Sequence, residues 1–190
     1  MKILIACEYS GAVRDAFIAR GHDAISCDLL PTDRPGPHYQ GDVRDILDDG
    51  FDLMVAHPPC THLAVSGARW FKEKLTEQAE ALDFVRVLLN APIERIALEN
   101  PVSIISSRIR KPSQIIQPWQ FGHPESKATC LWLQNLPPLV PTHILEKPAS
   151  GHWQNQTPSG QNKLSPGKDR WKLRSATYQG IANAMADQWG

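Results

Sequence analysis

The sequence lacks several features that define specialised classes of protein. None of its apolar runs approaches the roughly 20 residues of a membrane-spanning helix, so a membrane protein is not indicated. Its four cysteines, at positions 7, 27, 60 and 130, lie far apart and form no paired spacing. So few cysteines in a chain of 190 residues predict a reduced, cytoplasmic protein and not a disulfide scaffold.

Net charge is also absent, because 20 acidic residues balance 20 basic ones, and this argues against a strongly nucleic-acid-binding protein. The distribution is uneven, however. Residues 1–60 hold 10 acidic and 5 basic residues, a net charge of −5, so residues 61–190 carry +5. Such an asymmetry is compatible with a neutral small molecule on one side and a polyanion on the other, or with no function at all.

Short apolar runs alternate with helical patterns in the first half of the chain. This alternation predicts an α/β fold with a mostly parallel sheet and helices on both faces. In such sheets, ligands bind in the loops beyond the carboxyl ends of the strands. The expected strands are Lys2–Cys7, Ala24–Cys27, Phe51–Ala56 and Ile93–Leu98, and the expected helices are Val13–Arg20 and Glu73–Asn90.

The amino-acid composition changes after Asn100, since ten of the 16 prolines fall between Pro101 and Pro166. We expect a strand at Ala128–Leu133, a largely irregular excursion at Leu136–Arg170 and a closing helix at Arg174–Trp189. The length fits a single domain, 1–190, with residues 136–170 as an insertion.

Three strand-ending loops carry residues suited to a nucleotide-like cofactor. Gly11 opens a helix and would let backbone amides approach a ligand, although a plain turn explains it equally well. Asp28 ends the second strand, where an acid commonly accepts hydrogen bonds from a ribose. Asp42 is either an acid that contacts adenine or only a helix N-cap.

The sharpest local pattern is His57-Pro58-Pro59-Cys60 after a strand. Two prolines hold Cys60 rigidly, and helix N-termini with Arg69 nearby would lower its pKa and make it a nucleophile. A buried structural cysteine is the alternative. Glu99 follows the next strand, where apolar surroundings would raise its pKa and let it donate or share a proton, unless it only forms an ion pair.

A zinc site is a weaker reading of the same region. His57, Cys60 and His62 form an H-x2-C-x-H pattern, but three residues around a Pro-Pro turn cannot easily converge on one ion. The order is also the reverse of that in zinc nucleobase deaminases, so we expect no metal.

Taken in order, these segments resemble the DNA cytosine-5 methyltransferase family. Tyr9-Ser10-Gly11 resembles the start of its cofactor loop, Pro58-Pro59-Cys60 its nucleophile loop and Glu99-Asn100-Pro101 its E-N-V loop. Two later stretches, Phe121-Gly122-His123-Pro124 and Tyr178–Ala184, are similar to family stretches near the base and the cofactor. The resemblance spans nearly the whole chain.

The resemblance implies a Rossmann-like fold that binds S-adenosylmethionine and methylates carbon 5 of cytosine in DNA. Cys60 would attack carbon 6 and Glu99 would act at ring N3. Lys127 is expected to be the third catalytic residue, since it stands where the family supports the flipped cytosine with arginines, although it cannot reproduce a guanidinium fork. The residues expected to bind the cofactor are Tyr9, Ser10, Gly11, Asp28, Asp42, Pro58 and Asn183.

The substrate is less certain than the chemistry, because the family's target-recognition lobe shrinks here to about residues 136–170. We expect duplex DNA as partner, held at its phosphates by a basic cluster of Lys163, Lys168, Arg170, Lys172 and Arg174. A nucleotide or single-stranded substrate, an amino-group methyltransferase and a non-catalytic DNA-binding protein on this fold remain alternatives.

Overall fold

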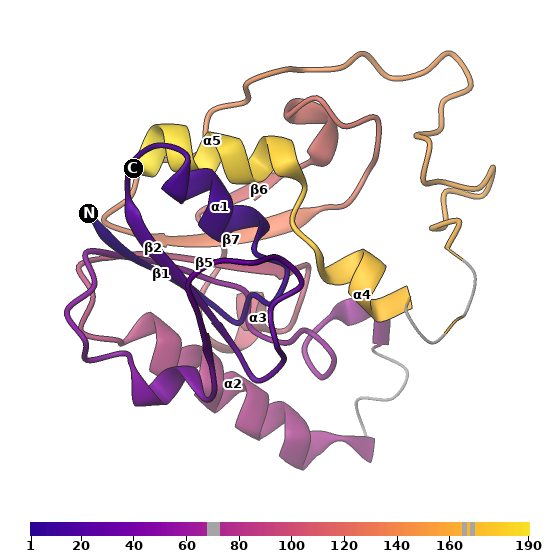
Figure 1. Ribbon diagram of the computed structural model, residues 1–190. Helices are drawn as coiled ribbons and strands as arrows, with labels where there is room; N and C mark the ends of the chain where they lie inside the picture. The colour runs from indigo at the N-terminus through magenta and orange to yellow at the C-terminus, as the bar shows by residue number, and fades with distance from the viewer. Residues whose placement is uncertain (68–72, 165–166, 168–169) are drawn as a thin grey trace.

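Seven strands form one sheet in the order β3-β2-β1-β4-β5-β7-β6 in the computed structural model (Figure 1). Strands β1 to β5 pair in parallel, and β7 runs antiparallel to its neighbours β5 and β6. The structure describes residues 1–67, 73–164, 167 and 170–190, without the side chains of residues 170, 171 and 173. The strands are β1 (Lys2–Ala6), β2 (Asp23–Asp28), β3 (His38–Gln40), β4 (Leu53–Ala56), β5 (Arg95–Pro101), β6 (Gln114–Ile116) and β7 (Thr129–Gln134).

Helices cover both faces of this sheet, which confirms the predicted fold class. In Figure 1, α1 (Ala12–Ile18) and α5 (Gln179–Trp189) lie together above the sheet and α2 (Leu75–Leu89) lies below it. Shorter helices are α3 (Ile105–Arg108), α4 (Arg170–Ser175) and two 3-10 turns, η1 (Val43–Asp45) and η3 (Pro118–Gln120). None of the helices in the described parts of the chain is long and apolar enough to cross a membrane.

The closing helix predicted over Arg174–Trp189 is wrong in extent, because α4 ends at Ser175 and α5 begins at Gln179. Tyr178 between them is extended, with φ −64° and ψ 136°. Its hydroxyl donates a hydrogen bond of 2.5 Å to Glu125, and this long-range contact accompanies the break in the helix.

The core lies on both faces of the sheet, as the continuous apolar strands predict. Because successive side chains of a strand point to opposite faces, Ile3 and Ile5 pack with α1 and α5, whereas Leu4 and Ala6 pack on the side of α2. All four are fully buried. In the described part of residues 136–164 there is no helix or strand; isolated bridges join Gln156 to Asn162 and His143 to Phe121.

The strand register brings the ends of four strands to one level. Ala6 of β1 lies opposite Cys27 of β2 and Ala56 of β4, and Ala56 in turn lies opposite Leu98 of β5. The next residues along these strands are Cys7, Asp28, His57 and Glu99, which therefore share one edge of the sheet. Because β7 runs the other way and pairs its first residue, Thr129, with Pro101, the residues just before β7 lie at the same edge.

Candidate active site

The loop after β4 is fixed from two sides. The backbone N–H of His57 donates to the carbonyl of Ala6 (2.9 Å), and the buried side chain of Asn100 donates from Nδ2 to the carbonyl of Pro58 (2.9 Å). Pro58 is buried, whereas Cys60 is exposed. Cys60 is therefore an exposed residue on a braced turn and not a buried structural cysteine, although its surroundings still partly desolvate the thiol.

Glu99 meets His57 across the two neighbouring strand ends. The Nδ1 atom of His57 lies 3.1 Å from Oε2 of Glu99, and the two side chains are only 9% and 14% exposed. Burial alone would raise the pKa of Glu99, but the hydrogen bond from His57 and the charges of Lys127 and His57 together hold this pKa below its ordinary value. The prediction of a raised pKa is therefore wrong, because the sequence did not place His57 and Lys127 beside the carboxylate.

The pKa of the Cys60 thiol also differs from the prediction. Desolvation, followed by the negative charge of Glu99, raises its pKa, and the weaker effects of Lys127 and Arg174 in the opposite direction do not compensate. The predicted lowering of this pKa is wrong, and the Arg69 invoked for it lies outside the described residues. At neutral pH the site therefore pairs a protonated thiol with an ionised carboxylate.

Lys127 lies at the same edge and is tied to the end of the chain. Its Nζ atom donates to the carbonyl of Arg174 (2.8 Å) and lies 5.7 Å from the centre of the Tyr178 ring. Nearby, Nε2 of His123 accepts a hydrogen bond of 2.9 Å from the backbone N–H of Gly180. These contacts hold the segment between α4 and α5 against the stretch that precedes β7.

The amides that open α1 are already engaged within the chain. The carboxylate of the buried Glu8 accepts hydrogen bonds from the backbone N–H groups of Val13 (2.8 Å) and Arg14 (3.3 Å) and from the hydroxyl of Ser10 (3.0 Å). The expectation that these helix amides meet a ligand directly is therefore corrected. Glu8 holds the loop in place through these hydrogen bonds. The only feature of the sequence that indicates this role is the position of an acidic residue just before the helix.

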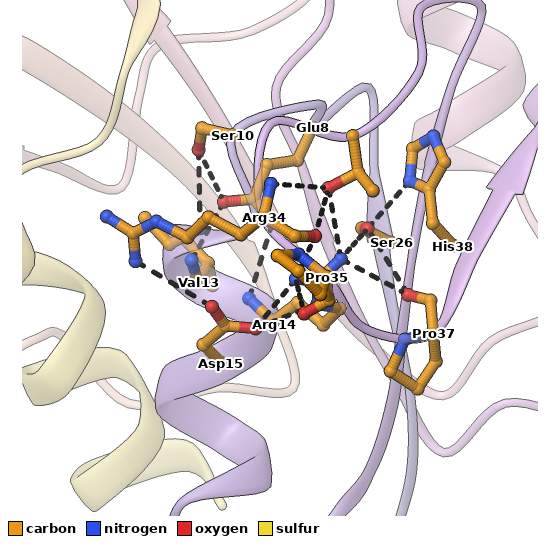
Figure 2. A network of polar contacts seen from close by, with 12 residues as sticks. Glu8, Ser10, Val13, Arg14, Asp15, Ser26, Arg34, Pro35, Pro37 and His38 are labelled. Carbon is orange, nitrogen blue, oxygen red and sulfur yellow. Dashed lines mark hydrogen bonds and ion pairs between the residues drawn. The ribbon is translucent and has the colours of Figure 1, made fainter.

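Arg14, which sequence reasoning also missed, joins this loop to the one after β2 (Figure 2). Its fully buried guanidinium donates to the hydroxyl of Ser26 (3.2 Å) and to the carbonyls of Arg34 (3.1 Å) and Pro35 (3.3 Å). A Cβ atom at Gly11 would lie 2.5 Å from Nη2 of Arg14, and φ at Gly11 is +71°. Glycine is thus needed there for the turn and for Arg14.

Asp28 and Asp42, the two acids expected to bind the cofactor, differ in how many hydrogen-bond partners they already have within the chain. Asp28 is half-buried, accepts one hydrogen bond from the N–H of Leu30 (2.9 Å), and has a pKa raised mainly by burial. Asp42 caps η1 by accepting from the N–H of Arg44 (3.0 Å), and its carboxylate also pairs with the guanidinium of Arg44, which lowers its pKa. Asp28 is the better placed of the two to accept a further hydrogen bond.

The other residues expected at the cofactor also have partners within the chain. Tyr9 is buried, and its hydroxyl lies 2.9 Å from Oγ of Ser175. Asn183, in α5, accepts a hydrogen bond of 3.0 Å from the side chain of Gln179. The loop after β1 is therefore in contact with the end of α4.

The basic cluster is only partly described. Lys163 and Arg174 are exposed, whereas Nζ of Lys172 lies 3.7 Å from Asp33 and 5.4 Å from the centre of the Tyr9 ring. Lys168 lies outside the described residues, and Arg170 begins α4. Within the described residues, no three His, Cys, Asp or Glu side chains form a group that could hold a metal ion.

Comparison with known proteins supports the fold. No protein-family model and no curated protein matches the sequence. A methyltransferase of Entamoeba histolytica, EhMeth, has 15% identity and a TM-score of 0.53, over 75% of this chain and 57% of its own. A prophage-encoded E. coli protein assigned as a DNA modification methyltransferase has 12% identity and a TM-score of 0.49, over 78% of this chain and 53% of its own. A mutant of DNMT2 from Spodoptera frugiperda has 17% identity and a TM-score of 0.41, over 75% and 54%.

The chain therefore has a Rossmann-like fold that is similar to the fold of EhMeth. It spans little more than half the length of each of these three proteins.

Proposed function

We propose that this protein is an S-adenosylmethionine-dependent methyltransferase that acts on carbon 5 of cytosine in DNA through a covalent Cys60 adduct. The observation that carries the proposal is that the Cys60 turn follows β4 and Glu99 lies near the end of the neighbouring strand β5, with Asn100 of β5 bonded to the carbonyl of Pro58 in the turn. A nucleophile and a proton-handling group side by side are what addition to an aromatic ring requires.

S-adenosylmethionine fits the edge formed by the loops after β1 and β2. Asp28 is half-buried and has capacity for a ribose hydroxyl, and Pro58 is buried directly after β4, the strand next to β1. When bound, the cofactor supplies an electrophilic methyl group. Tyr9, Ser10, Gly11, Asp42 and Asn183 complete the set of residues that we assign to its pocket.

The protonation states suggest how the reaction begins. The ionised Glu99 takes the proton from the Cys60 thiol, and the thiolate sulfur forms a bond to carbon 6 of the ring. The electron pair displaced from the ring double bond moves toward N3, and Glu99 returns its proton there, so no outside acid is consumed. Carbon 5 then carries the nucleophilic electron pair and receives the methyl group. Loss of the carbon 5 proton to a base, return of the N3 proton and expulsion of the thiolate complete the cycle.

Lys127 has a different part in this scheme. Its positive charge lowers the pKa values of both Cys60 and Glu99. Lys127 therefore stabilises the Glu99 carboxylate before the proton transfer and the Cys60 thiolate after it. An ammonium beside the ring also stabilises negative charge that develops during the attack.

The experiment uses a DNA duplex that contains 5-fluorocytosine, with S-adenosylmethionine present. Fluorine at carbon 5 cannot leave as a proton, so the wild-type protein is expected to accumulate a covalent protein–DNA adduct. Cys60→Ser is expected to form none and to keep its affinity for the cofactor. Cys130→Ala, with its cysteine buried in β7, is the control and should still form the adduct. Adduct formation by Cys60→Ser would contradict the proposal.

A further inference from the structure

Buried polar atoms without partners gather around the proposed site. Six buried side-chain nitrogen or oxygen atoms in the described residues have no hydrogen-bond partner. Four of them belong to the loop after β4, which holds Cys60, and to the end of β5 with the loop that follows it, which hold Glu99. These four atoms are Nε2 of His57, Nδ1 of His62, Oδ1 of Asn100 and Oγ of Ser103. Because an unpaired buried polar atom costs about 1–3 kcal/mol, such a concentration indicates a functional requirement at this place.

His57 stands out among the four because its other nitrogen contacts Glu99. An ionised carboxylate can only accept hydrogen bonds, so the hydrogen between the two groups belongs to Nδ1 of His57. Nε2, the other nitrogen of this ring, is the buried atom without a partner. The backbone of His57 is fixed by its bond to Ala6 and by Pro58 behind it, so the ring has little freedom to turn.

We infer that His57 is a positioning residue for the reaction: its Nδ1–H group holds the Glu99 carboxylate ionised and directed to take the proton of the Cys60 thiol. This inference rests on the proposed function and adds to it a residue that acts only through Glu99. Without His57, burial would favour the protonated form of Glu99, which cannot accept the thiol proton.

Other ionisable groups surround the pair formed by His57 and Glu99. The other charged or titratable groups around the pair are Cys60 and His62 of the turn, Lys127 before β7, and Arg174 of α4.

The test compares His57→Asn with His57→Leu in single-turnover methylation of a cytosine-containing duplex at pH 8. The Nδ2 of Asn can replace Nδ1–H as a donor to Glu99, so His57→Asn should keep the rate within about tenfold. His57→Leu has no donor and should lose about 10- to 100-fold. Equal rates in His57→Asn and His57→Leu would overturn the inference.

His22→Asn is the matched control, because His22 also has a buried, unpartnered Nδ1 but precedes β2 at the opposite edge of the sheet. It should keep the wild-type rate. Nitrogen-15 NMR of the histidine rings separates this inference from the proposed function, since it needs no turnover. Hydrogen on Nδ1 of His57 at neutral pH, with a ring signal that moves in Glu99→Gln, is the expected result even for a substrate other than DNA. Hydrogen on Nε2 alone would refute the inference.

Discussion

The side-chain amide of Asn100 donates a hydrogen bond of 2.9 Å to the carbonyl of Pro58, and this contact helps to join the Glu99 strand to the Cys60 turn. Both partners are buried. The relative position of Cys60 and Glu99 therefore depends in part on a bond that involves neither of their side chains.

Asn100→Ala should lower the free energy of unfolding by about 1–3 kcal/mol, because the carbonyl of Pro58 loses its donor in a buried place. The rate of methyl transfer should fall while cofactor affinity stays near that of the wild type. Urea unfolding and single-turnover kinetics measure the two effects. Asn90→Ala is the control, since Nδ2 of Asn90 donates to Arg86 at the exposed end of α2, where water replaces the lost bond. Equal losses in the two variants would contradict this explanation.

The reactivity of Cys60 provides a test of the site's electrostatics. The charge of Glu99 raises the pKa of the thiol, so Glu99→Gln should lower this pKa and increase the thiolate fraction at pH 8. Alkylation of Cys60 by iodoacetamide, followed by mass spectrometry of the modified peptide, should become about three- to tenfold faster. Lys127→Ala should slow it, because the opposing charge is removed. Unchanged alkylation in Glu99→Gln would mean that burial alone sets the pKa.

The sequence predicted the position of this site better than its chemistry. Polar residues that follow apolar strands must meet at one edge when the strands are parallel and in register, and the structure confirms that Asp28 and Glu99 do so. The pKa directions of Cys60 and Glu99 depend instead on their distances to each other, to His57 and to Lys127. Such distances between segments are set by packing and leave no local pattern.

The elements missed by the sequence are short. Strands β3 (His38–Gln40) and β6 (Gln114–Ile116) have three residues each, too few for an alternation of apolar and polar residues to stand out. Arg14 was missed for the opposite reason, because the helical pattern around it is clear and a lone arginine in such a pattern is usually solvated. Its burial depends on the loop after β2, which supplies acceptors from far along the chain.

Arg14→Met should destabilise the protein by at least about 2 kcal/mol in urea unfolding, because several buried acceptors lose their donor at once. The control is Arg20→Met. Arg20 pairs with Asp187 at 2.5 Å, but the two side chains are 27% and 54% exposed, so its loss should cost about 1 kcal/mol or less. If Arg14→Met unfolds like the wild type, the network in Figure 2 contributes nothing to stability.

Calorimetry with S-adenosylmethionine can separate the two acids at the cofactor edge. Asp28→Ala should weaken binding by about 1–3 kcal/mol, as expected for the loss of a buried hydrogen bond. Asp42→Ala should weaken it less, because Arg44 already occupies the carboxylate of Asp42. Asp48→Ala, at an exposed position, should bind like the wild type. Unchanged affinity in Asp28→Ala would remove Asp28 from the cofactor pocket.

Salt dependence decides between duplex DNA and a smaller substrate. If cations of the basic cluster neutralise phosphates, log affinity for a duplex should fall with log salt concentration, with a slope of about −0.9 per phosphate. Lys163→Ala and Arg174→Ala should each reduce that slope by about one phosphate and weaken all sequences alike, because both side chains are exposed and phosphate contacts do not specify sequence. Lys172→Ala should also disturb cofactor binding, since Lys172 contacts Asp33 and Tyr9. Arg86→Ala on α2 should change neither property.

Methylation of a duplex, a single strand and free dCMP should be fastest on the duplex. Turnover of dCMP at an equal rate, without salt-dependent binding of DNA, would instead assign Cys60 and Glu99 to a nucleotide substrate.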